Sequence, residues 1–154
     1  MTTRADISSA NWAALVEAAP AIARAVSASG GSTTHSEQEL GAFIAFVGDA
    51  SVQAGGESLL GQLVADVAGR LAGGVPAPDG DVYVDGLEKA RKAGAILSVE
   101  ADPDEATAVR AWLLGAARAV AAAAKDGGVL GVGAKTFSDW EKETIGSIAD
   151  ALGA

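Results

Sequence analysis

Asp102-Pro103-Asp104-Glu105 opens the stretch of this chain that decides its fold. The pattern places a cap-type residue three positions before a Glu. The first side chain can then accept from a free N–H of the first helical turn, while the Glu reaches back to the N–H of the cap residue. Pro103 suits the first helical position, and the acidic side chains complement the positive end of the helix dipole. Apolar residues follow at helical spacing and predict a long helix that ends at Gly127-Gly128: Val109, Trp112, Leu113, Ala116, Ala117 and Val120.

The same helix-start signal occurs twice more along the chain. Ser36-Glu37-Gln38-Glu39 predicts a helix from Ser36 to about Val52. Ser138-Asp139-Trp140-Glu141 predicts another from Ser138 to Leu152. Three capped helices within 154 residues indicate an all-α protein.

Three further helices follow from apolar residues at helical spacing. We expect one to begin after Ser8 or Ser9, with a kink or break near Ala19, because Pro20 lacks a backbone N–H and clashes with the preceding turn. The others cover about 57–72 and 84–99. Residues 82–86 fit a short extended piece as well as a helix start, so both states stay open here.

The predicted architecture is a compact bundle of five to six helices that forms a single domain over residues 1–154. Much of the 49% apolar fraction is alanine and aromatic residues make up only 5%, so we expect small core side chains and closely approaching backbones. Gly61, Ala65 and Gly69 form a smooth ridge suited to close contact with a second helix. The larger side chains expected to face inward include Trp12, Leu15, Val16, Ile22, Val26, Leu40, Phe43, Ile44, Val47, Leu59, Leu63, Val64, Val67, Leu71, Leu87, Leu97, Trp112, Trp140, Ile145, Ile148 and Leu152.

The charge balance excludes several classes of partner. Twenty acidic and 11 basic residues give a formal net charge of −9, which repels nucleic acid and anionic membrane surfaces. The absence of Cys excludes disulfides, thiol nucleophiles and thiolate metal sites. We find no secretory signal, and the uncharged apolar runs are far shorter than the roughly 18 to 20 residues of a membrane helix. We therefore expect a soluble, cytoplasmic protein.

The most distinctive loop is Gly127-Gly128-Val129-Leu130-Gly131-Val132-Gly133. A phosphate-binding glycine loop leads from a strand into a helix, and a P-loop adds Lys and Ser or Thr directly after its last Gly. Here the stretch follows a helix, and Ala134 separates Gly133 from Lys135. The glycines and apolar residues favour a connection packed on the bundle, or a loop that binds a partner. The residues predicted for such a partner contact are Gly128, Val129, Leu130, Gly131 and Val132.

The other motifs do not assign a catalytic, cofactor-binding or metal-ligating residue. An EF-hand beginning at Asp79 fails, because its fifth and sixth positions hold Tyr83 and Val84. His35 is the only histidine, and the Glu-x-x-His signature of di-metal bundles is absent. We expect no cofactor, and only weak binding of divalent cations to surface carboxylates stays open.

Two stretches of this chain resemble known bacterial proteins. Lys125-Asp126-Gly127-Gly128-Val129-Leu130-Gly131-Val132-Gly133 and the helix after it are similar to the ends of short, Ala-rich bacterial proteins of unassigned function, which carry a Gly-Gly-x-Leu-Gly-x-Gly loop. Ala5-Asp6-Ile7-Ser8-Ser9-Ala10-Asn11-Trp12 resembles their start. The helical layout is more distantly similar to the TerB-type tellurite-resistance fold, an all-α domain associated with metal stress. No TerB-type acidic metal motif matches here residue by residue, so the resemblance implies no metal ligands.

These observations predict a non-catalytic helical interaction or scaffold module, with a protein partner or a second copy of the chain as the bound species. We expect no enzymatic activity, because no catalytic constellation is found. The alternative is an acidic metal-binding stress protein of TerB type.

Overall fold

The structure, a computed structural model, describes residues 1–30, 36–126 and 139–154, and only the backbone of 124–126. Within these ranges a 3-10 turn, η1 (Arg4–Asp6), precedes six α-helices: α1 (Ser9–Ser29), α2 (Ser36–Gln53), α3 (Leu59–Leu71), α4 (Val82–Glu100), α5 (Pro103–Asp126) and α6 (Asp139–Leu152). The predicted all-α bundle of five to six helices is confirmed. Over the described ranges, no helix combines the length and apolarity that crossing a lipid bilayer requires.

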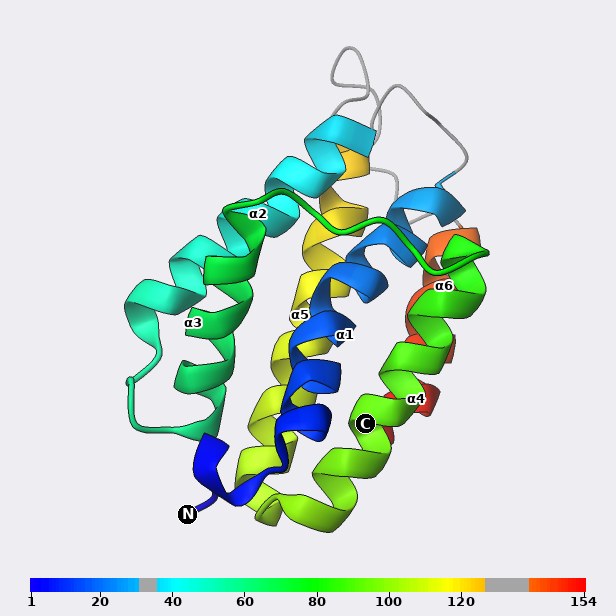
Figure 1. Cartoon of the computed structure of the whole chain (residues 1–154). Helices are drawn as coiled ribbons and strands as arrows, with labels where there is room; N and C mark the ends of the chain where they lie inside the picture. The colour runs from blue at the N-terminus through cyan, green and yellow to red at the C-terminus, as the bar shows by residue number, and fades with distance from the viewer. Residues whose placement is uncertain (31–35, 127–138) are drawn as a thin grey trace.

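Helix α1 lies at the centre of the bundle and contacts each of the other five helices (Figure 1). Between Asn11 and Ser27 it carries only two charged residues, Glu17 and Arg24. Such a helix is apolar on nearly every side, as a buried helix must be. The buried surface of α1 therefore extends beyond the predicted stripe. It includes further small residues: Ala14, Ala18, Ala21 and Ala25.

Pro20 lies within α1, which continues without interruption from Ser9 to Ser29. Of the predicted kink or break, the break is therefore wrong, while the kink stays a prediction. A proline in a helix interior costs about 3 kcal/mol, because it removes a backbone hydrogen bond and clashes with the preceding turn. Both neighbours of Pro20 are buried, as is its own ring, so tertiary packing on α1 offsets this local penalty.

Small residues bring α4 against α1, and this is the most extensive helix pair in the described chain. An ideal Cβ on Gly86 would lie 2.5 Å from the Cβ of Ala25 and 3.0 Å from the carbonyl oxygen of Ala21. An ideal Cβ on Gly94 would lie 2.7 Å from the carbonyl oxygen of Leu152, at the end of α6. The expected close approach of backbones is confirmed at these two positions.

The remaining helices flank the central pair on two sides. Figure 1 shows α2 and α3 on one side of α1 and α5, and α4 and α6 on the other. Phe46 of α2 stacks on Trp112 of α5 with ring centroids 6.1 Å apart. On the opposite side, Arg110 of α5 donates to the carbonyl oxygen of Leu152 at 2.8 Å and to the hydroxyl of Ser98 at 2.6 Å. These donations tie the end of α6 to α4 and α5.

Side-chain caps determine where α4 begins. Oδ1 of Asp81 accepts from the backbone N–H groups of Tyr83 and Val84, each at 3.0 Å. This is the geometry of an Asp N-cap. Residues 82–86 are therefore helical, and the extended alternative for them is wrong.

The start of α5 uses different partners from those of a capping box. The N–H of Asp102 donates to the hydroxyl of Thr2 at 2.7 Å, and not to Glu105. The carboxylate of Glu105 instead accepts from the N–H of Leu59 at 3.1 Å, at the first residue of α3. The reciprocal bond predicted between Asp102 and Glu105 is thus replaced by contacts from two other segments.

Two residues predicted for the core lie at the surface. Ile44 is 45% exposed and Trp140 is 70% exposed. The predicted ridge is also only partly correct, because Gly61 is buried while Ala65 and Gly69 are exposed. In α2 and α6 the inward arc includes polar residues, which an apolar pattern does not count. They are Glu39 in α2, beside Phe43 and Val47, and Glu141 and Thr144 in α6, beside Ile148 and Leu152.

The turn η1 allows a test by acid titration. The backbone N–H of Thr3 donates to Oδ2 of Asp6 at 2.8 Å and its hydroxyl donates at 2.9 Å, and these bonds hold the pKa of Asp6 below its ordinary value of 3.8. We expect Thr3→Ala to move this pKa up toward 3.8, because only the backbone donor remains. A lowered folded-state pKa stabilises the fold above pH 3.8, and this contribution is lost as the pH falls through the folded-state pKa. Carboxyl-carbon NMR would measure the shift, with Thr107→Ala as the control that leaves Asp6 unchanged.

Candidate interaction surface

The side of α2 that points away from the bundle carries exposed apolar and small residues in its middle, with exposed polar residues toward both ends of the helix. We call the apolar and small residues of this side the α2 outer face, and all five are exposed at helical spacing: Gly41, Ile44, Ala45, Gly48 and Val52. Val52 is 86% exposed. Apart from the local helix backbone, no atom of the described chain lies within 4 Å of the place where a Cβ on Gly41 or Gly48 would stand.

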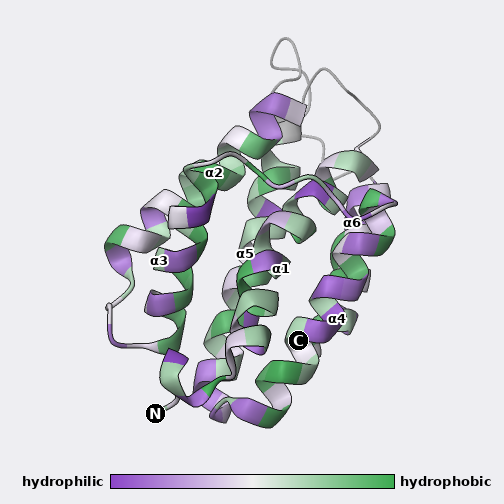
Figure 2. Cartoon of the chain, viewed as in Figure 1, coloured by the Kyte–Doolittle hydropathy of each residue, from purple (hydrophilic) through white to green (hydrophobic). Residues whose placement is uncertain are grey.

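The α2 outer face is also free of charge along most of its length. No charged residue occurs between Glu39 and Asp49, in a chain whose net charge is −9. Figure 2 shows hydrophilic colour toward the ends of α2 and apolar or neutral colour between them. Single exposed apolar residues are ordinary, but a continuous apolar helix face is the kind of surface that packs against another helix.

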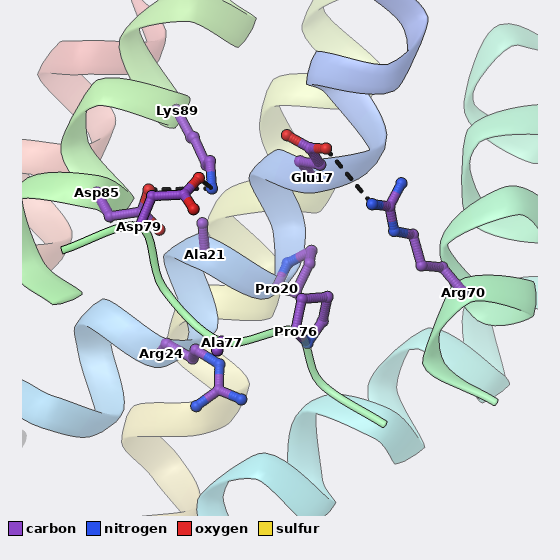
Figure 3. Close-up of a pocket in the computed structure, with 10 residues that line it drawn as sticks. All are labelled: Glu17, Pro20, Ala21, Arg24, Arg70, Pro76, Ala77, Asp79, Asp85 and Lys89. Carbon is purple, nitrogen blue, oxygen red and sulfur yellow. Dashed lines mark hydrogen bonds and ion pairs between the residues drawn. The ribbon is translucent and has the colours of Figure 1, made fainter. Parts of the chain in front are cut away.

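A second candidate is a charged pocket between α1, α4 and the loop that follows α3 (Figure 3). Its volume is about 160 Å³. Three cationic and three acidic side chains line this pocket, together with two prolines and two alanines. The lining residues are Glu17, Pro20, Ala21, Arg24, Arg70, Pro76, Ala77, Asp79, Asp85 and Lys89.

Lys89 joins two carboxylates on one side of this pocket. Its Nζ lies 3.0 Å from Oδ1 of Asp85 and 3.1 Å from Oδ2 of Asp79. Asp85 is 5% exposed, whereas Asp79 is 86% exposed on its loop. Burial acts to lower the pKa of Lys89, but the hydrogen bonds with Asp85 and Asp79 and their negative charges outweigh it, so the pKa lies above its ordinary value.

The arginines of the pocket also hold other parts of the chain. Nη2 of Arg24 donates to the carbonyl oxygen of Val75 at 2.6 Å, while its buried Nε meets no acceptor among the described residues. Nη2 of Arg70 lies 3.4 Å from Oε1 of Glu17. Ligand pockets usually measure about 300–1,000 Å³. We therefore interpret this smaller pocket as the place where ion pairs and one arginine fasten the loop from α3 to α4 onto the bundle.

Two buried carboxylates lie near the end of α1. Glu39 of α2 is 3% exposed and Glu141 of α6 is 6% exposed. An ideal Cβ on Gly30 would lie 3.6 Å from Oε1 of each. Oε2 of Glu39 also accepts a hydrogen bond from the buried hydroxyl of Ser27. The sequence placed both acids in a helix-start signal and did not predict that they are buried.

The residues predicted for partner contact cannot be placed. Gly128, Val129, Leu130, Gly131 and Val132 lie outside the described residues, and so does His35. Among the residues that are described, no group of three or more His, Cys, Asp and Glu side chains is arranged to hold a metal ion. Sequence reasoning missed the α2 outer face because it placed Ile44 in the core. The available signal was the uncharged run over residues 40–48.

Comparison of the chain with protein-family models, with curated proteins and with solved structures finds no match.

Proposed function

We propose that this chain is a non-catalytic helical interaction module that acts in the cytoplasm and binds a protein through the α2 outer face. The observation that carries the proposal is the row of four exposed apolar or small residues from Gly41 to Gly48, with no charged residue among them, on a helix whose other side packs on α3 and α5. Apart from Arg24, which donates to a carbonyl oxygen, the charged side chains around the pocket are already paired with one another. The α2 outer face is therefore the described surface best suited to a protein contact.

A capture experiment with matched variants tests this proposal. Ala45→Glu adds a negative charge at the centre of the α2 outer face, and Ala65→Glu adds the same charge at an exposed position of α3. Both alanines are exposed, so both variants should keep the circular dichroism spectrum of the wild type. We expect Ala45→Glu to lose about nine-tenths of a bound partner, because burial of an unpaired charge is unfavourable, while Ala65→Glu retains it. Equal retention by both variants would contradict the proposal.

The predicted loop contact can be examined in the same assay. Leu130→Asp removes the largest apolar side chain of residues 128–132. A loss of partner with an unchanged melting temperature would add this loop to the contact surface. Unchanged binding together with an unchanged melting temperature would remove it.

An acidic metal-binding protein of TerB type is the second candidate function. The feature that favours it is the pair of buried carboxylates, Glu39 and Glu141, which approach the same backbone position from two helices. A metal that binds only the native state must raise the melting temperature. A rise with millimolar Ca²⁺, Mg²⁺, Mn²⁺ or Zn²⁺ that Glu141→Gln removes would support this function. An unchanged melting temperature with all four metals would reject it.

A further inference from the structure

We infer that Asp79 is a site of covalent modification, at which the main chain rearranges spontaneously from aspartate to isoaspartate. The reaction needs an Asp side chain, the backbone nitrogen of the next residue, and enough freedom for the two to meet. Glycine at the next position favours it, because no Cβ blocks the approach. This modification is independent of the proposed function.

The dipeptide Asp-Gly occurs at two places that the structure describes in full. Asp79-Gly80 lies in the loop of residues 72–81, and Asp85-Gly86 lies near the start of α4. A third, Asp126-Gly127, ends outside the described residues. Because the first two dipeptides are identical, a difference in their reactivity is due mainly to the structure around them.

Asp79 and Gly80 are placed so that they can react. The side chain of Asp79 is 86% exposed. Gly80 is exposed, its φ is +86°, and its N–H donates to no acceptor in the described part of the chain. The printed restraint on Asp79 is the ion pair with Lys89, at 3.1 Å (Figure 3). An ion pair with so exposed a partner is weak and opens readily.

The second dipeptide is held away from this reaction. Asp85 is 5% exposed, and its Oδ1 lies 3.0 Å from Nζ of Lys89. Gly86 is buried within α4, where the N–H of a residue donates to the carbonyl four residues earlier. Ring closure here would require that nitrogen to give up its helical bond. An ideal Cβ on Gly86 would lie 2.5 Å from the Cβ of Ala25, so α4 packs tightly at this point and opens rarely.

The reaction balances with water as its sole co-reactant. The backbone nitrogen of Gly80 attacks Cγ of Asp79. One side-chain oxygen then leaves as water, with the proton of the N–H and one proton from solvent, and a succinimide ring closes. Water next adds to either ring carbonyl. Addition at Cγ restores aspartate, whereas addition at the main-chain carbonyl carbon breaks its bond to the Gly80 nitrogen and leaves the chain running through Cγ.

Isoaspartate at this position alters an anchor of the loop. The main chain becomes one methylene longer, and the carboxylate is then carried directly on Cα. Asp79 is one of the two carboxylates on Lys89, and Asp81 caps α4 two residues further on. The modification therefore changes the exposed contact of Lys89 and leaves its buried contact with Asp85 in place.

Incubation of the folded chain near neutral pH tests the inference. Trypsin then releases residues 71–89 as one peptide that carries both sites. Chromatography separates the isoaspartyl form from its isomer of equal mass, and electron-based fragmentation locates it, because it cleaves the Cα–Cβ bond that isoaspartate places in the main chain. We expect isoaspartate to form about tenfold faster at Asp79 than at Asp85, since reaction at Asp85 awaits local opening of α4. In guanidinium chloride, where the chain is unfolded, the two rates should converge. Equal rates in the folded chain, or no isoaspartate at Asp79, would overturn the inference.

Two variants test the ring closure itself. Asp79→Glu keeps a carboxylate but would need a larger ring, which closes more slowly, so isomerisation at this position should stop. Asp79→Asn should react faster than the wild type, because a neutral amide is attacked more readily than a carboxylate, and its loss of ammonia changes the mass. Position 79 is exposed, so both variants should keep the circular dichroism spectrum of the wild type. Continued isomerisation in Asp79→Glu, or an amide that survives the same incubation in Asp79→Asn, would contradict the mechanism.

Discussion

Gly86→Ala should lower the free energy of unfolding by about 1–3 kcal/mol, because it inserts a methyl group where two backbones already touch. The added Cβ would lie 2.5 Å from the Cβ of Ala25 and 3.0 Å from the carbonyl oxygen of Ala21. Carbon atoms prefer separations of about 3.5–4.0 Å, so α1 and α4 must move apart. Urea unfolding followed by circular dichroism would give the change, with an unchanged slope showing that the compactness of both states is kept.

Gly69→Ala is the matched control for this prediction. Gly69 lies in α3, is exposed, and has no neighbouring atom within 4 Å of an added Cβ. Alanine should stabilise that helix by about 0.5–1 kcal/mol, since glycine has more conformational freedom to lose. Adding Ala25→Gly to Gly86→Ala removes the closest atom and should recover part of the loss. Equal effects of the alanine variants at Gly86 and Gly69 would show that α1 and α4 do not approach as described.

The helices of this fold could be predicted from the sequence because their signals are local. A cap, a stop and a row of large apolar residues lie within one segment, as at Ser8 and at Asp102. Burial of alanines such as Ala18 and Ala25 was not predictable in this way, because alanine is compatible with both core and surface. The pattern of large residues therefore outlined one stripe of α1, whereas the whole helix is central.

The candidate surface was predicted less well than the helices. In α2 the inward arc includes Glu39, and in α6 it includes Glu141. Counting apolar residues alone predicts an orientation in which both acids face away from the core. That orientation wrongly placed Ile44 and Trp140 in the core. The i,i+4 spacing of Asp85 and Lys89 is typical of an ion pair on a helix. The burial of this ion pair beneath the loop from α3 could not be predicted, because it depends on contacts between distant segments.

Lys89→Met should destabilise the fold by about 3 kcal/mol, because it leaves the carboxylate of Asp85 buried without its partner. Asp85 is 5% exposed, and the Nζ of Lys89 lies 3.0 Å from its Oδ1. Asp79→Ala removes the other carboxylate on Lys89, but Asp79 is 86% exposed, so this change should cost about 0–1 kcal/mol. The pair of variants separates the buried ion pair from the exposed one. Similar losses in both variants would contradict the assignment.

The cause of the loss can be identified by neutralising the stranded carboxylate and by raising the pH. Adding Asp85→Asn to Lys89→Met should recover most of the stability, since a neutral amide is less costly to bury than an unpaired charge. In the wild type, the raised pKa of Lys89 gives stability that is fully present below the unfolded-state value of 10.5 and is lost as pH rises through the folded-state value. Lys89→Met lacks that titration, so its stability should fall less steeply above pH 10.5. Urea unfolding at pH 8 and at pH 11 would measure the difference, and parallel declines would show that Asp85 gains nothing from the ammonium.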